Sequence, residues 1–381
     1  MKNTFLLLLI IGLFACNPKP NNNPDSYVLP EIKIKKHPKN IILMIGDGMG
    51  ITQITAGMYM NGNKLNLEQF PMVGLHKSYS SDKLITDSAA GATAFASGIK
   101  TYNGAIGVNP DTIPVKTILE EAEEYGLATG LVSTSSIVHA TPASFIAHQK
   151  LRKMYEEIAT DFLNTEIDYF VGGGKAYFDI RDDGRVLSDE LKAKGYYMSD
   201  YFQKDFNELD INFDQNFGYL TANKEPLKLT QGRDYFIAAT QMAPTFLNNH
   251  SDNGFFLMIE GSQIDWGGHA NDSEYIITEM IEFDKAIGKI LDFAQEDGET
   301  LVIVTADHET GGYAINMGST MDSIVAGFTT DYHTACLIPV FAFGPGAEIF
   351  GGIYENTEIY NKMRKAFNFK KINEESKPKS D

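Results

Sequence analysis

Side chains that could carry chemistry occur in short blocks spread over most of this chain of 381 residues. One block, residues 86–94, contains a single serine hydroxyl, that of Ser88, at the start of a run of small residues. The acidic and imidazole candidates lie far from it in sequence: Asp47, Glu260, Asp265, His269, Asp307, His308 and His333. A hydroxyl nucleophile surrounded by carboxylates and imidazoles is what metal-assisted phosphoryl transfer requires, because cations activate the hydroxyl and neutralise the phosphate.

Most of the acidic candidates follow directly on an apolar run of β character. Asp47 follows the run at residues 40–45, Glu260 follows the run at 255–259, and Asp307 and His308 follow the run at 301–305. Unbroken apolar runs are typical of parallel strands that are covered on both faces, and sites form where such strands end. Several carboxylates at one sheet edge repel each other strongly unless cations lie between them. The sequence therefore predicts a metal centre at this edge.

A spacing of four residues separates Asp265 from His269. On a helix this spacing places both side chains on one face, where they can share an ion. The pair alone is a weak signal, but it strengthens the prediction when His308 and His333 are counted with it.

The elements that must position these residues alternate between strands and helices. Further apolar runs occupy 128–133, 169–172 and 338–343, and segments of helical period occupy 89–97, 115–125, 143–163, 234–249 and 273–295. This alternation predicts an α/β fold with a doubly wound, mostly parallel central sheet and helices on both faces. We expect one catalytic domain over residues 40–369, with polar and weakly periodic residues 177–230 as an insertion beside its core.

The first residues predict export. Residues 1–15 combine Lys2 with an apolar run that is too short to span a bilayer comfortably, which is typical of a signal peptide. The end of this run resembles a bacterial lipoprotein signal, which would make Cys16 the lipidated first residue of a periplasmic or outer-membrane-anchored protein. An ordinary secretory signal is the alternative. Residues 16–39 are interpreted as a tether and lead-in, and residues 370–381 as a disordered tail.

The formal net charge of −18 limits the kinds of partner. Long-range repulsion disfavours nucleic acid as the main partner, and we expect membrane contact only through the lipid anchor. Small anions can still bind where metal ions reverse the local sign of the potential.

The order of the blocks resembles that of the alkaline phosphatases, a family within a large metal-dependent superfamily. The matching blocks are residues 40–50, 86–108, 132–152, 172–174, 255–269, 301–312 and 333–346. The resemblance implies a homodimeric phosphomonoesterase of broad range. Such an enzyme would hydrolyse small phosphate monoesters to an alcohol and inorganic phosphate through a phosphoserine intermediate on Ser88.

The resemblance also implies two zinc ions (Zn²⁺) and one magnesium ion (Mg²⁺). The implied ligands are Asp47, Asp307 and His308, beside Ser88, for one zinc; Asp265, His269 and His333 for the other zinc; and Asp47, Thr141 and Glu260 for magnesium. Arg152 would grip two phosphate oxygens, because its planar guanidinium matches their geometry.

Four further positions lie in or near these blocks, and three of them, Asp87, Trp266 and Glu309, allow two interpretations. Asp87 orients either Arg152 or the start of the helix. His139 would act on the third metal through water or hydrogen bonds, which would favour zinc there over magnesium. Trp266 either packs beside the site or tunes phosphate binding, and Glu309 is either a partner of the metal site or a surface charge.

Other activities are known on the same kind of scaffold. Sulfatases need a proline and an arginine after the nucleophile, whereas Ser88 is followed by two alanines and a glycine. Phosphodiesterases of this superfamily usually use threonine and lack the block around Arg152, and cofactor-independent phosphoglycerate mutase is a further alternative. A phosphate-binding lipoprotein without turnover would lack the nucleophile or a ligand, and none is missing from this sequence.

Overall fold

The computed structural model describes residues 32–370. The predicted signal peptide, Cys16 and nearly all of the predicted tail lie outside these residues. Among the described helices, none combines the length and the hydropathy that a bilayer-spanning segment needs.

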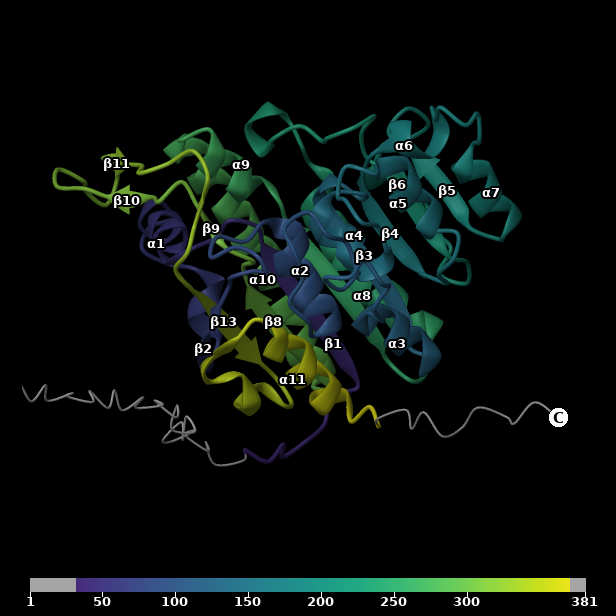
Figure 1. Ribbon diagram of the computed structural model, residues 1–381, viewed down its shortest axis with the longest axis horizontal. Coiled ribbons are helices and arrows are strands. Elements are labelled where there is room, and N and C mark those ends of the chain that lie inside the picture. Colours follow the sequence, from purple (N-terminus) through teal and green to yellow (C-terminus); the bar gives the residue numbers. More distant parts are fainter. Residues whose placement is uncertain (1–31, 371–381) are drawn as a thin grey trace, which may run out of the picture. The chain divides into compact units, whose positions relative to one another are not determined.

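A ten-stranded sheet forms the centre of the fold, in the order β14-β2-β13-β8-β1-β7-β3-β4-β6-β5 (Figure 1). Its strands are β1 Asn40–Gly46, β2 Met72–Lys77, β3 Ala128–Ser136, β4 Tyr169–Gly173, β5 Tyr197–Asp200, β6 Phe217–Leu220, β7 Phe255–Gly261, β8 Thr300–Thr305, β13 Leu337–Phe343 and β14 Gly352–Glu355. Within this sheet, as far as the structure describes the chain, β13 is antiparallel to both of its neighbours and the other pairings are parallel. The prediction of a mostly parallel sheet is confirmed.

Helices cover both faces of this sheet, because the side chains of a strand alternate between its faces. In β1, Ile41, Leu43 and Ile45 belong to one apolar core, and Ile42 and Met44 belong to the other. The first core is closed by α2 Ser88–Ser97, α3 Ile118–Glu124, α4 Ala140–Ile146, α5 Tyr155–Asp161, α6 Lys175–Asp179, α7 Leu187–Ala193 and α11 Thr357–Phe367. The second core is closed by α1 Ile51–Met60, α8 Tyr235–His250, α9 Gln263–His269 and α10 Ser273–Asp297.

The single helix predicted over residues 143–163 is wrong. The structure has α4 and α5 with an irregular segment between them. In this segment the backbone N–H of Arg152 donates to the carbonyl of Gly104, and Gln149 exchanges two backbone hydrogen bonds with Ile106. Pairing with this distant loop takes the backbone groups that a continuous helix would need.

Residues 177–230 contain β5 and β6, which extend the sheet beyond β4. The segment is therefore continuous with the sheet at this edge. That it is an insertion relative to a smaller core stays a prediction. Two small pairings lie elsewhere: β10 Ala314–Ile315 with β11 Ala326–Gly327, and β9 Glu309–Thr310 with β12 His333–Thr334.

Candidate active site

Three neighbouring strands bring their acidic residues to the same edge of the sheet. In the pairing register Ile45 lies opposite Glu260 on β7 and opposite Thr305 on β8. Asp47 therefore leaves β1 beside Glu260 and beside the loop that carries Asp307. The strand order β8-β1-β7 explains how residues so distant in sequence meet here.

The loop after β1 depends on Gly48. Its φ of +70° is in the left-handed region, which glycine adopts without the strain of a side chain. A Cβ atom at this position would also lie 2.7 Å from Asp265 Cα and 2.7 Å from Thr310 Oγ1. The backbone N–H of Gly48 donates to Asp307 Oδ1 at 3.2 Å, which fixes that carboxylate against the loop.

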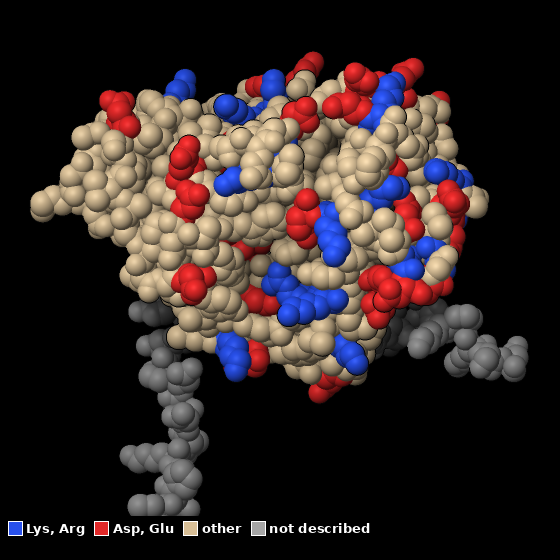
Figure 2. Space-filling view, turned by 90° about the horizontal axis from the view of Figure 1, so that it is seen from above, with Lys and Arg blue, Asp and Glu red and all other residues tan. Residues whose placement is uncertain are grey.

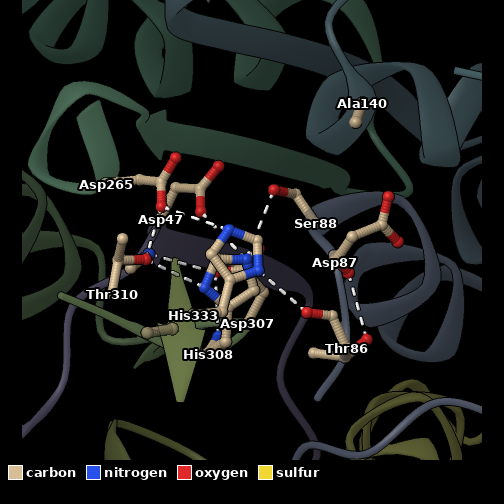
Figure 3. Close-up of polar contacts among 12 residues, drawn as sticks. Asp47, Thr86, Asp87, Ser88, Ala140, Asp265, Asp307, His308, Thr310 and His333 are labelled. Atoms are coloured by element: carbon tan, nitrogen blue, oxygen red, sulfur yellow. Dashed lines mark hydrogen bonds and ion pairs between the residues drawn. The ribbon is translucent and has the colours of Figure 1, made fainter. Parts of the chain in front are cut away.

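The first group of possible metal ligands consists of Asp47, Asp307 and His308, each contributing an atom within 4.8 Å of the others. His308 Nε2 lies 3.1 Å from Asp307 Oδ2 and 3.5 Å from Asp47 Oδ1. Ser88 Oγ lies 3.4 Å from the same nitrogen. All three ligand side chains are fully buried, so the predicted nucleophile faces a water-poor cluster (Figure 3).

The second group consists of Asp265, His269 and His333. Asp265 lies 3.4 Å from His269 Nε2 and 3.6 Å from His333 Nε2, and the two Nε2 atoms are 3.2 Å apart. The α9 helix positions the first two residues, as their spacing predicts, and β12 positions His333.

Each imidazole is held in the tautomer that leaves Nε2 free for a metal. His269 Nδ1 donates to the carbonyl of Asp331 at 2.6 Å, and His333 Nδ1 donates to the carbonyl of Thr86 at 2.8 Å. His308 Nδ1 lies 3.3 Å from Thr310 Oγ1, which itself donates to Asp265. Metal-ligating histidines usually have such a partner on the second nitrogen, because it fixes the orientation of the ring.

The third group contains Asp47, His139 and Glu260. Thr141, predicted as a ligand, is fully buried on α4, and its hydroxyl has no hydrogen-bond partner in the described residues. The sequence predicted that His139 acts on the third metal through water or hydrogen bonds, whereas the structure brings one of its ring nitrogens within 4.8 Å of the two carboxylates, close enough for a direct ligand. His139 Nε2 also accepts from Arg152 Nη2 at 3.3 Å.

Each of the first and third groups contains buried carboxylate oxygens without hydrogen-bond partners among the described residues. In the described part of the chain both oxygens of Asp47, Oε1 of Glu260 and Oδ2 of Asp307 have no hydrogen bond. Burial, then Asp307, Asp265 and Glu260, raise the pKa of Asp47 well above its ordinary value, and burial raises the pKa of Glu260 to about 8. Ionised carboxylates without cations are costly in such surroundings. The residues therefore fit bound metal ions.

Asp87 performs both of the roles between which the sequence could not decide. Its Oδ1 accepts from the backbone N–H of Ala90 at 3.0 Å and so caps α2, and its Oδ2 accepts from Arg152 Nη1 at 3.0 Å. Ser88 is the first residue of α2, and its hydroxyl is not used for capping. Gly91 allows α2 to pack against the site, because a Cβ there would lie 3.0 Å from the Cβ of Asp307.

Trp266 packs beside the third group. Its ring meets the ring of His139 edge-on, with the centroids 6.1 Å apart. This contact supports a packing role, and no described contact bears on tuning of phosphate binding.

Sequence reasoning missed Thr310 and Ser135. Thr310 joins the two zinc-type groups through Asp265 and His308, and Ser135 donates to Glu260 at 3.2 Å. The signal that could have found Thr310 is its hydroxyl two positions after the predicted ligand His308, on the short strand β9. Ser135 lies in a run of serines and threonines at the end of β3 that was not interpreted.

A doubly wound α/β sheet whose carboxyl edge gathers a buried serine, an arginine and three groups of possible metal ligands is typical of a metal-dependent phosphoryl-transfer enzyme. The alkaline phosphatase family profile matches residues 38–326, and the chain belongs to this family.

Curated relatives and solved structures agree with this membership. The chain is 36% identical to alkaline phosphatase 3 of Bacillus subtilis, over 88% of this chain and 90% of that protein. It is 31% identical to the alkaline phosphatase of Escherichia coli K12, over 88% and 87% of the two chains. It is 47% identical to the alkaline phosphatase of the Antarctic bacterium TAB5. The match to that solved structure covers 89% of this chain and 100% of the TAB5 chain, with a TM-score of 0.83.

Proposed function

We propose that this chain, a hydrolase of phosphate monoesters, works through a phosphoserine on Ser88. The observation that carries the proposal is the position of Ser88 Oγ, 3.4 Å from His308 Nε2 at the start of a buried helix. The Ser88 hydroxyl would lose its proton to solvent as its oxygen forms a bond to phosphorus. The ester P–O bond would break, and the alcohol would leave with a proton from water. Water would then attack phosphorus, restoring the Ser88 hydroxyl and releasing inorganic phosphate.

The phosphoryl group would be held by Arg152 and by the start of α2. Asp87 holds the guanidinium in place, with its Nη1 3.0 Å from Oδ2, and caps the helix whose first backbone N–H groups can face an anion. On the face shown in Figure 2, acidic and basic side chains of the described residues are interspersed. A small ester would therefore be recognised by local groups at the site rather than by a broad charged surface.

Zinc suits the first two groups, because aspartate and histidine ligands in sets of three are typical of zinc sites with an open position. Asp47, Thr141 and Glu260 would hold magnesium, which prefers oxygen ligands. The imidazole of His139 in this group favours zinc at the same place. A mutant of the TAB5 enzyme has magnesium bound in its M3 site. When bound, such ions lower the pKa of an oxygen nucleophile and neutralise charge on the phosphoryl group.

The decisive test compares three esters in metal-loaded protein. We expect rapid hydrolysis of p-nitrophenyl phosphate, slow hydrolysis of the bis ester and little hydrolysis of the sulfate. Preference for the bis ester would favour the phosphodiesterase alternative. Tight phosphate binding without turnover would favour the phosphate-binding lipoprotein.

Export, anchoring and dimer formation are further proposals. Lys2, the apolar run after it and Cys16 support a lipid-anchored protein outside the cytoplasm. Cell fractionation of wild type and Cys16→Ser tests this, because the variant should lose its membrane association. Family membership supports a homodimer, and a light-scattering mass near twice that of the 42.2 kDa chain would agree with it.

A further inference from the structure

Glu309 follows the metal-ligating His308 directly, and the structure buries it beside the site. Only 6% of its surface is exposed. Glu309 begins β9, the two-residue strand that pairs with β12, and in this pairing it lies opposite Thr334, the residue after His333. A ladder of two residues on each side gives little stability by itself. Another contact must therefore hold His308 and His333 in register.

Both oxygens of Glu309 are fully engaged. Oε1 accepts from Gln53 Nε2 at 2.7 Å and from the backbone N–H of Tyr313 at 3.0 Å. Oε2 accepts from the backbone N–H of Gly312 at 3.2 Å and from the hydroxyl of Thr334. One carboxylate thus connects α1, the turn after β9 and the strand opposite.

Gln53 extends this connection towards the loop of Asp47. Its side chain is fully buried on α1, and its Nε2 also donates to the carbonyl of Thr310 at 2.8 Å. Gly50 begins the same helix, and a Cβ there would overlap Glu309 Cγ and lie 2.9 Å from Glu309 Cβ. The φ of Gly50 is −76°, which any residue can adopt, so backbone conformation does not require a glycine here. The glycine instead leaves space for the side chain of Glu309.

We propose that Glu309 is a positioning residue for the metal centre, which acts by fixing the β9–β12 pair to α1. Through this pair it sets the places of His308, of Thr310 with its hydrogen bond to Asp265, and of His333. The proposal goes beyond the proposed function and rests on it only in taking zinc as the ion.

The test is the zinc affinity of the metal-stripped full-length chain, measured by competition with a chromophoric chelator. In Glu309→Gln an NH₂ group replaces one carboxylate oxygen and meets a backbone N–H that can only donate. We expect zinc affinity to fall by up to about 10- to 100-fold, the range typical of changes to residues that orient metal ligands. Excess zinc should restore most of kcat, because no group that touches the substrate has changed.

Ile290→Ala is the matched control. Ile290 is fully buried in the second core, in the C-terminal half of α10. The variant would open a cavity there and should lower Tm without lowering zinc affinity. Equal zinc affinity in wild type and Glu309→Gln would overturn the proposal. A loss of zinc affinity in Ile290→Ala as large as that in Glu309→Gln would also overturn it, because general destabilisation would then explain both. A wild-type chain that binds no zinc would instead overturn the proposed metal centre, so the two failures are distinguishable.

Discussion

The Nε2 atoms of His269 and His333 lie 3.2 Å apart although the residues are 64 positions apart in sequence. Backbone carbonyls accept from the Nδ1 atoms of both rings, so in the neutral rings both Nε2 atoms are acceptors that face each other. Two acceptors at this distance repel unless a cation or a proton lies between them. This relationship makes metal removal the first experiment.

Metal removal should abolish hydrolysis and lower Tm. The buried carboxylates of Asp47 and Glu260 would lose their counter-ions, and ligands that bind only the folded state stabilise it. Activity and calorimetry before and after treatment with a chelator measure both effects, and zinc with magnesium should restore them. Full activity in protein shown by elemental analysis to be metal-free would refute the metal-dependent mechanism.

Ser88→Ala should lose nearly all turnover. We expect kcat/KM to fall by about three orders of magnitude or more, because loss of a nucleophile removes the covalent route while binding remains. Tm should hardly change, since Asp87 and not Ser88 caps α2.

Ser97→Ala is a suitable control at the other end of the same helix, where the hydroxyl bonds only to the carbonyl of Thr93 in the described contacts. Trapping of ³²P on the protein at acidic pH gives an independent check. Wild type should be labelled and Ser88→Ala should not.

Arg152→Ala should weaken the binding of substrate and of inorganic phosphate. The variant removes charge-assisted hydrogen bonds to the phosphoryl group, each worth about 1.5–3 kcal/mol. The inhibition constant for phosphate should therefore rise about 10-fold or more. Arg152→Lys should recover only part of this loss. Lys153→Ala, at an exposed neighbouring position, should leave the inhibition constant unchanged, and an equal effect there would point to general electrostatics.

Glu123 predicts a pH dependence of stability away from the active site. Burial raises its pKa from 4.5 to about 7, while Thr129 Oγ1 donates to it at 3.2 Å. Because the folded pKa is above the unfolded one, this contribution to stability is complete below about pH 4.5 and is lost as pH rises through 7.

Glu123→Gln should remove this loss, so the variant should be more stable than wild type at pH 8 and gain less at pH 5. Denaturant midpoints at both pH values measure the difference. The exposed Glu157→Gln should show no such trend. A gain that is equal at both pH values would contradict the assigned titration.

Gly50→Ala should destabilise the fold and weaken zinc binding together. The new Cβ would overlap the side chain of Glu309. Overpacking at a buried position costs about 1–3 kcal/mol, which a denaturant midpoint would show. Unchanged stability would mean that α1 can shift away from the site without cost.

The strands that carry the site could be predicted because their signals are local. The apolar runs before Asp47, Glu260 and Asp307 end where β1, β7 and β8 end, or within two residues of it. The break between α4 and α5 could not be predicted in this way. It arises from the pairing of Gln149 with Ile106, whose energy depends on the distant loop and not on the helical period of the segment.

The same distinction explains the side chains. The groups around Asp307 and Asp265 follow from residue type and from strand ends. The position of His139 among the third group's ligands depends on the turn after β3, which a one-dimensional pattern does not determine. The sequence leaves open whether Glu309 is a surface charge or a partner of the metal site. Its four hydrogen bonds in the folded chain show that it is buried beside the site.

Asp47 is shared by the first and third groups, and one carboxylate has only two oxygens. Loading of these two sites should therefore be cooperative. An ion that enters at Glu260 would draw Asp47 into the ionised form that its neighbour beside Ser88 also requires. The identity of the ion held beside Glu260 would then influence how readily the serine reacts. The ions of these two sites could not be exchanged independently in a metal titration.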